Sequence, residues 1–204
     1  MGLADGYEKA RFGTKVALML LAAATIFVWI ALSCTGWIRT TAAAGKYEGF
    51  QVGLWRICDD AKLSPTCIQL DGWGKVWFNG VQGFVSLGFI GINVAFLLVV
   101  LFLFVSSCQK NREIAMATTV VCVISGLLYL SGVVIFGAKF DEDYIEPYSN
   151  KVGKDPFKIG YCFGLSIVAI VFELIAGCLI YLDSKKDSQN TRPSNQNEIH
   201  NGII

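Results

Sequence analysis

The side chains with the clearest chemistry in this chain are two cysteines, Cys58 and Cys67, which lie in a polar stretch between two long apolar segments. Two thiols so close in sequence, just outside a membrane, are most simply joined as a disulfide. Structural disulfides persist in oxidising compartments and are rare in the cytosol. The pair therefore predicts that this polar stretch lies on the outer side of a membrane.

The rest of the chain offers little for catalysis. Its single histidine, His200, lies close to the C-terminal end. No glycine-rich phosphate loop follows a predicted strand, and no Cys/His cluster has the spacing of metal ligands. The basic residues are dispersed and balanced by acidic ones, with a net charge of +1, which argues against nucleic acid as a partner. We expect no enzyme activity, no cofactor and no metal site.

Hydrophobic residues make up 54% of the chain and are concentrated in four blocks. Each block approaches or exceeds the roughly 20 residues that a helix needs to cross a bilayer. In lipid the backbone polar groups of a segment must pair within it, and a helix achieves this. The first block is longer than the apolar part of a secretory signal, so we interpret it as a retained helix. The predicted membrane helices are residues 16–36, 81–105, 114–138 and 159–182.

The expected disulfide also orients these helices. If the loop that holds Cys58 and Cys67 faces outward, both termini lie in the cytoplasm, and basic residues in the hinge and beyond the fourth helix agree with the positive-inside rule. We therefore predict a multi-pass protein of the plasma membrane. Its other segments are a cytoplasmic N-terminus (1–15), a first outer loop (37–80), a cytoplasmic hinge (106–113), a second outer loop (139–158) and a disordered cytoplasmic tail (183–204).

The first outer loop is too small to fold around a core alone, so a disulfide is expected to staple it. Residues 50–58 alternate between two faces, with Phe50, Val52 and Leu54 on one of them, which is typical of a strand. A second strand over residues 66–70 would return antiparallel to the first. The sequence predicts a cross-linked hairpin.

Four tryptophans flank or lie in this loop. Trp37, Trp55, Trp73 and Trp77 have amphipathic rings suited to the boundary between lipid and water. For three of the four we expect membrane anchoring rather than contact with a ligand. Gly53, within the first predicted strand, would allow another backbone to approach closely.

Trp37, the triplet Gly53-Leu54-Trp55 and the two cysteines together resemble the signature of the claudin superfamily. That superfamily includes claudins, peripheral myelin and epithelial membrane proteins, lens fibre membrane proteins and certain channel auxiliary subunits. The resemblance implies an α+β membrane protein, with a left-handed bundle of four transmembrane helices and a small extracellular antiparallel β-sheet. The chain departs from claudins near Asn79 and Gln82, where the arginine that claudins commonly carry is missing.

Glu173 is the one formal charge within the four apolar blocks. An intramembrane carboxylate is a functional group by default. No second acid or base lies in the blocks to form a proton relay, so we interpret Glu173 as structural, either protonated or hydrogen-bonded to Asn93 or Ser125.

The remaining cysteines suggest a different chemistry. Cys108, beside Lys110 at the cytoplasmic end of the second helix, is a candidate for palmitoylation. The others lie inside or at the edge of membrane helices, where we expect buried free thiols. They are Cys34, Cys122, Cys162 and Cys178.

Small residues recur within the helices and permit close helix packing. We expect this packing to be intramolecular, and lateral self-association is the alternative. The residues are Gly83, Gly88, Gly91, Gly126, Ser131, Gly132, Gly160 and Gly164.

The second outer loop places acidic residues before lysines. A solvated loop is the simpler interpretation, and a patch that attracts cations or docks a partner is the sharper one. The candidate residues for contact with a neighbouring molecule are Phe50, Val52, Asp141, Glu142, Asp143 and Glu146.

The resemblance implies a claudin-like protein that contributes to cell–cell junctions, adhesion or a paracellular barrier through its extracellular sheet. The expected partners are the lipid bilayer and like or related four-span proteins in the same or an apposed membrane. The C-terminal Ile204 is a weak candidate for a PDZ scaffold, because Gly202 supplies no side chain. The alternatives are an auxiliary subunit that modulates an ion channel, and an organiser of membrane and trafficking like the epithelial membrane proteins.

Overall fold

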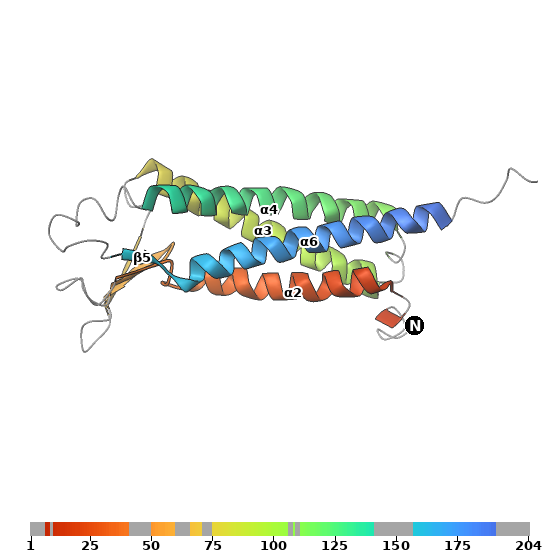
Figure 1. The fold of residues 1–204 in the computed structure, drawn as a ribbon, viewed down its shortest axis with the longest axis horizontal. Coiled ribbons are helices and arrows are strands. Elements are labelled where there is room, and N and C mark those ends of the chain that lie inside the picture. Colours follow the sequence, from red (N-terminus) through yellow and green to blue (C-terminus); the bar gives the residue numbers. More distant parts are fainter. Residues whose placement is uncertain are drawn as a thin grey trace, which may run out of the picture.

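The computed structural model describes residues 7–8, 10–40, 50–59, 66–70, 75–105, 108, 111–140 and 157–190. Within these residues, four helices are long and apolar enough to cross a membrane. They are α2 (Phe12–Ser33), α3 (Val76–Phe104), α4 (Arg112–Phe140) and α6 (Tyr161–Asn190). The helices lie side by side as a bundle, with α2 along α6 and α3 along α4 (Figure 1). The predicted four-helix bundle is confirmed.

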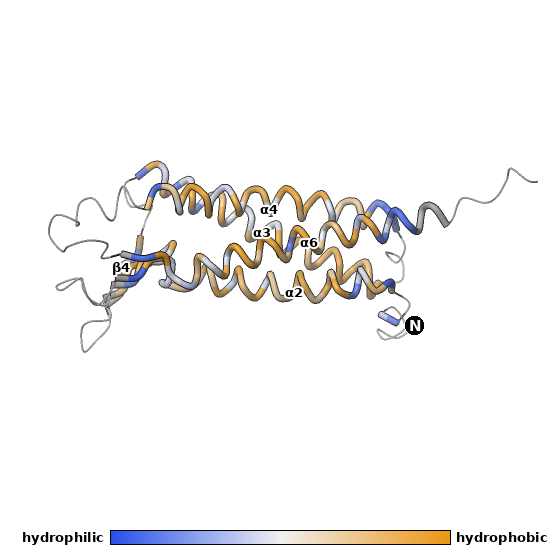
Figure 2. Tube along the Cα trace, viewed as in Figure 1, coloured by the Kyte–Doolittle hydropathy of each residue, from blue (hydrophilic) through white to orange (hydrophobic). Residues whose placement is uncertain are grey.

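The helices do not end where the apolar residues end. Figure 2 shows apolar residues along most of the bundle and hydrophilic residues near its ends. α6 continues past Leu182 to Asn190, so the prediction that a disordered tail begins at residue 183 is wrong for this segment. The physical reason is that hydropathy marks where lipid ends, whereas polar residues such as lysine are good helix formers in water.

The described strands form one antiparallel sheet at one end of the bundle (Figure 1). Four of them come from the segment between α2 and α3, and the fifth directly precedes α6. Their order across the sheet is β4-β3-β2-β1-β5. The strands are β1 (Ile38–Thr40), β2 (Phe50–Val52), β3 (Arg56–Asp59), β4 (Thr66–Gln69) and β5 (Phe157–Ile159). The antiparallel sheet predicted from the family resemblance is confirmed.

One predicted strand is in fact two. Residues 50–58 do not run straight, because β2 and β3 pair antiparallel with Gln51 opposite Cys58. The chain reverses at Gly53, whose N–H donates to the carbonyl of Arg56 at 2.8 Å. Alternation of side chains cannot distinguish a strand from a tight hairpin whose two arms share a face. The predicted return strand is observed as β4, paired with β3.

The sheet rests on the bundle by its central strands. Its register aligns one apolar residue from each strand into a row across the sheet. Ile38 and Val52, in the middle of the row, are 0% and 3% exposed, whereas Ile68 at one edge is 72% exposed. The edges of the sheet therefore extend beyond the helices that cover its centre. The full row is Ile159, Ile38, Val52, Ile57 and Ile68.

The core changes character along the bundle. The cluster near the sheet contains bulky rings, including Trp37, Phe78, Tyr129 and Phe136. The cluster farther from the sheet contains alanines and aliphatic side chains. Such small residues allow close helix packing. The alanines are Ala17, Ala95, Ala115 and Ala176.

The glycines of α3 and α4 pack mainly within the molecule. A methyl group at Gly88 would lie 2.6 Å from Tyr129 Cβ, and one at Gly132 would lie 2.7 Å from a methyl carbon of Val85. At Gly83 and Gly164 a methyl group would meet no described residue within 4 Å. The intramolecular interpretation therefore holds for most of this set, whereas Gly83 and Gly164 pack against none of the described residues.

Candidate functional site: the junction of sheet and bundle

Trp37 lies at the centre of the junction and is fully buried. Its indole N–H donates to the carbonyl of Ala31 in the last turn of α2 at 2.7 Å. Its ring packs edge-on against Phe136, with centroids 5.0 Å apart, and against Phe163 at 6.0 Å. The prediction that Trp37 belongs to an interfacial belt is therefore wrong. A tryptophan beside a helix end can face inward as readily as outward, and the sequence does not show which.

The backbone around Trp37 joins three elements. The N–H of Trp37 donates to the carbonyl of Val52 in β2 at 3.0 Å. Its own carbonyl accepts a hydrogen bond from the N–H of Gly160 at 2.8 Å, just before α6. A methyl group at Gly160 would overlap the carbonyl of Gly36. The hydrogen bond to Trp37 and the close contact with Gly36 therefore hold Gly160, at the start of α6, against the segment that follows α2.

Gly53, Leu54 and Trp55 form the turn between β2 and β3. A methyl group at Gly53 would lie 2.5 Å from the carbonyl oxygen of Cys34, so only glycine fits against that backbone. Leu54 is fully buried, and Trp55 is 38% exposed. The expected close approach of another backbone to Gly53 is confirmed. The triplet packs between the sheet and the end of α2.

Gln82, on α3, is hydrogen-bonded to this turn. Its side chain lies on α3 and is 8% exposed. Its amide nitrogen donates to the carbonyl of Leu54 at 2.7 Å and to the carbonyl of Leu70 at 3.3 Å. A buried carbonyl without a partner is costly, so Gln82 stabilises both the turn at Leu54 and the end of β4 at Leu70. In the sequence, Gln82 stands out only as a departure from claudins, and its polar side chain within an apolar block was the available signal.

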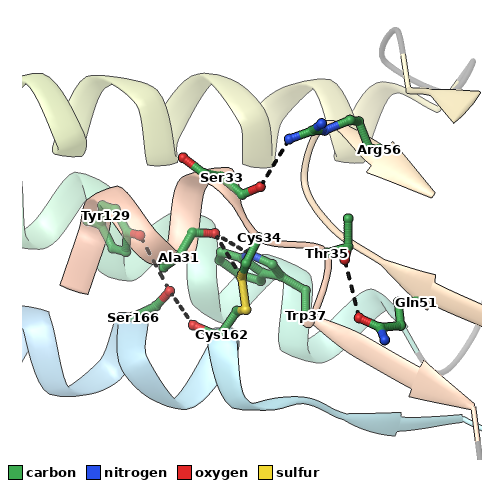
Figure 3. Close-up of a disulfide and its surroundings, with 10 residues drawn as sticks. All are labelled: Ala31, Ser33, Cys34, Thr35, Trp37, Gln51, Arg56, Tyr129, Cys162 and Ser166. Carbon is green, nitrogen blue, oxygen red and sulfur yellow. Dashed lines mark hydrogen bonds between the residues drawn. A yellow bond between two sulfur atoms is a disulfide. The ribbon is translucent and has the colours of Figure 1, made fainter. Parts of the chain in front are cut away.

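Two disulfides lie at this end of the molecule. Cys58 and Cys67 are directly opposite each other in β3 and β4 and are bonded, with an S–S distance of 2.03 Å. Cys34, after α2, is bonded to Cys162 in the first turn of α6, with Cα atoms 6.7 Å apart (Figure 3). The expectation of free thiols at Cys34 and Cys162 is therefore wrong.

The Cys34–Cys162 bridge was not predicted, although the order of the helices held a signal for it. Cys34 and Cys162 are 128 residues apart in sequence. However, the end of the first helix and the start of the fourth lie on the same side of the membrane. Of the remaining cysteines, all of them in described positions, Cys122 is buried, Cys108 is partly buried and Cys178 is exposed on the bundle surface. Cys178 therefore departs from the expected burial.

The structure tests only some of the residues predicted to contact a neighbouring molecule. Val52 is 3% exposed and packs in the core, so the prediction that it faces a neighbour is wrong. Phe50 is in β2, but its side chain lies outside the described part of the structure. The acidic candidates of the second outer loop also lie outside the described residues. They are Asp141, Glu142, Asp143 and Glu146.

Glu173 lies within the bundle, away from the junction. It is fully buried, and the hydroxyl of Ser125 on α4 donates to one of its carboxyl oxygens. The other oxygen has no hydrogen-bond partner among the described residues. Asn93, the other partner considered, instead accepts a hydrogen bond from the indole of Trp29 at 3.2 Å. The contact with Ser125 supports the structural interpretation of Glu173.

The described part of the chain contains no group of three or more His, Cys, Asp or Glu side chains placed to hold a metal ion. The junction instead offers packing, hydrogen bonds and two covalent bridges. Its chemistry suits a scaffold that presents a surface.

Comparison with known proteins agrees with this architecture. The profile of the PMP-22/EMP/MP20/Claudin family matches residues 12–180, which include all four membrane helices up to the last turns of α6. A search of curated proteins finds no match to this chain. The resemblance drawn from Trp37, the Gly53-Leu54-Trp55 triplet and the paired cysteines is confirmed at the level of the family.

Proposed function

The chain belongs to the PMP-22/EMP/MP20/Claudin family, and on that premise we propose that it contributes to cell–cell junctions, adhesion or a paracellular barrier at the plasma membrane. The family is one of membrane proteins without enzymatic activity. The proposed action is non-covalent. The bundle holds the sheet at the membrane surface, and the sheet contacts like or related four-span proteins in the same or an apposed membrane.

The observation that carries this proposal is the fixed attachment of the sheet to the bundle. Gly53 packs against the backbone of Cys34, and Gln82 binds the carbonyl of Leu54. The Cys34–Cys162 bridge joins α2 to α6 directly below the sheet. A surface held in one orientation loses little conformational entropy when it meets a partner, which favours association.

Cysteine chemistry supports the proposed sidedness. Both disulfides lie at the sheet end, and such bonds persist in oxidising compartments. We therefore assign the sheet to the outside of the cell and both termini to the cytoplasm. Cys108, which is free and partly buried between α3 and α4, would then lie on the cytoplasmic side, where palmitoylation remains a proposal.

The contact surface is proposed at the β4 edge of the sheet instead of at Val52. Cys67, Ile68 and Gln69 are all exposed. An exposed edge strand offers unpaired backbone groups and favours pairing with another chain. Ile68 adds an apolar side chain that water does not favour. Phe50 and the acidic residues of the second outer loop remain further candidates.

Expression in cells without junctions tests this function. Labelled protein should concentrate where two transfected cells meet, and Ile68→Asp should reduce that enrichment several-fold because it places a charge at the contact. Lys158→Gln, on β5 at the other edge of the sheet, is the matched control and should leave the enrichment unchanged. Uniform label on wild-type cells would contradict the proposal, and co-purification of a channel with that uniform label would favour the auxiliary-subunit alternative.

A further inference from the structure

A cavity opens where α2 meets the turn between β2 and β3. Its volume is about 270 Å³, and it is lined by Leu32, Ser33, Cys34, Thr35, Trp55 and Arg56. The first four residues come from the end of α2 and the segment after it, and the other two come from the sheet. The cavity therefore lies at the depth where a membrane helix leaves the hydrocarbon and meets the lipid headgroups.

Arg56 supplies the charge in this cavity. Its side chain is exposed and reaches back from β3 to the end of α2 (Figure 3). There its guanidinium donates to the carbonyl of Ser33 at 3.4 Å. A guanidinium carries five N–H donors in a planar fork and matches the oxygens of a phosphate in pairs. Among the described residues this long hydrogen bond to Ser33 is the one that Arg56 makes, so most of its donors are open to a ligand there.

An apolar stripe on α2 leads up to the cavity. Ile26, Trp29 and Ile30 are 58%, 53% and 43% exposed, and with Ser33 they follow the spacing of one helix face. The indole of Trp29 is held toward α3 by its hydrogen bond to Asn93. Exposed apolar side chains on a membrane helix face acyl chains. Arg56 and Trp55 at the cavity are thus followed by the apolar stripe on α2. This order matches the order of headgroup and tails in a phospholipid.

We propose that this cavity binds the phosphate headgroup of a phospholipid in the leaflet on the sheet's side of the membrane. Arg56 binds the phosphate, Trp55 lies at the rim of the site, and an acyl chain follows the stripe of Ile26, Trp29 and Ile30. This inference goes beyond the proposed function, because the partner is a single lipid and not a neighbouring protein. A lipid bound here would contact both α2 and the sheet.

The test uses the full chain purified in detergent and native mass spectrometry to count bound lipid. Phosphatidylcholine should bind, and diacylglycerol with the same acyl chains should bind about tenfold more weakly, because hydrogen bonds to a charged group are lost. Inorganic phosphate alone should not bind at the same concentrations. Arg56→Gln should weaken phosphatidylcholine binding about tenfold, Arg56→Lys should weaken it less, and Lys158→Gln should leave it unchanged.

Equal binding of diacylglycerol and phosphatidylcholine to the wild-type protein would overturn the proposal, and so would unchanged phosphatidylcholine binding by Arg56→Gln. Binding of inorganic phosphate as tight as that of the lipid would also overturn the lipid proposal, and would indicate a site for free phosphate. The diacylglycerol comparison needs no variant, so it decides the question even if Arg56→Gln does not fold.

Discussion

Both ends of the bundle join α2 to α6, but with different chemistry. At the sheet end, Cys34 is bonded to Cys162. At the opposite end, the carboxylate of Asp183 accepts hydrogen bonds from the N–H of Thr14 at 2.8 Å and from its hydroxyl at 3.0 Å. A carboxylate at the N-terminus of a helix accepts a hydrogen bond from a backbone N–H that has no partner within the helix. Its negative charge also interacts favourably with the helix dipole. The two ends are therefore tied covalently and non-covalently, respectively.

The difference between the two ends indicates that the sheet end is the more rigid part of the molecule. The sheet end has two disulfides and a core of large rings around Trp37. The other end has a buried core of alanines and aliphatic side chains, and Asp183 packs against Gly13. A surface that meets partners gains from a fixed orientation, whereas the opposite end needs only to keep the helices together. Substitutions at the sheet end should therefore cost more than substitutions at the Asp183 end.

The largest effect is expected at Gly53. In Gly53→Val the new side chain would meet the backbone at Cys34 and Thr35, which cannot move away without displacing α2 from the sheet. We expect a loss of about 3 kcal/mol or more in the free energy of unfolding, and poor delivery to the cell surface. Surface biotinylation measures the delivery. Gly83→Val is the control, because a side chain there meets no described residue within 4 Å. Equal surface levels of the two variants would contradict the need for close contact at Gly53.

The next effect is expected at the hairpin bridge. Cys58→Ser removes the link between β3 and β4, which closes a short loop. By the chain-entropy relation this costs about 2 to 3 kcal/mol. Thermal unfolding in detergent measures the loss. Cys178→Ala, which changes a free thiol on the bundle surface, should leave the transition in place, and a similar shift in both variants would argue against a stapled sheet.

A smaller effect is expected at Gln82. Gln82→Leu keeps the size of the side chain but leaves the carbonyls of Leu54 and Leu70 without their donor. The expected loss is about 2 kcal/mol in the free energy of unfolding, with increased proteolysis of the sheet and an unchanged bundle. Limited proteolysis detects this. Asn79→Leu, at an exposed position on the same helix, is the control, and a Gln82→Leu variant as resistant as wild type would show that these hydrogen bonds do not hold the sheet.

The smallest effect is expected at the end away from the sheet. Asp183→Ala removes the cap on α2, which should cost about 1 kcal/mol. Hydrogen exchange should then rise in the first turn of α2 while the sheet stays protected. Ser184→Ala is the neighbouring control. If Asp183→Ala loosened the sheet as much as Gln82→Leu does, the two ends would not differ in the way proposed.

Much of this architecture was predictable because lipid imposes strict rules. A segment that crosses the membrane must pair its own backbone groups, so apolar length alone predicted the four helices. The pairing of Cys58 with Cys67 was predictable because the two are close in sequence. The helical segment after Leu182 was missed because polar residues can continue a helix beyond the lipid.

The junction was harder to predict because its contacts join distant parts of the sequence. Cys34 and Cys162 meet only after the first and fourth helices pack together. Trp37 is buried although its residue type is common at membrane surfaces. Gln82 gains its role only when the turn at Leu54 lies above it. Residue type and spacing singled out Trp37 and the Gly53-Leu54-Trp55 triplet, but not the Cys34–Cys162 bridge or the role of Gln82. Only the packing of the helices shows what these residues contact.

The most direct test of the covalent sheet end is a map of all seven cysteines in protein that has never been reduced. After alkylation of free thiols in intact cells and then in lysate, mass spectrometry should find Cys58 linked to Cys67 and Cys34 linked to Cys162. Cys108, Cys122 and Cys178 should carry the alkylating group. Alkylated Cys58 and Cys67, or alkylated Cys34 and Cys162, would contradict the account.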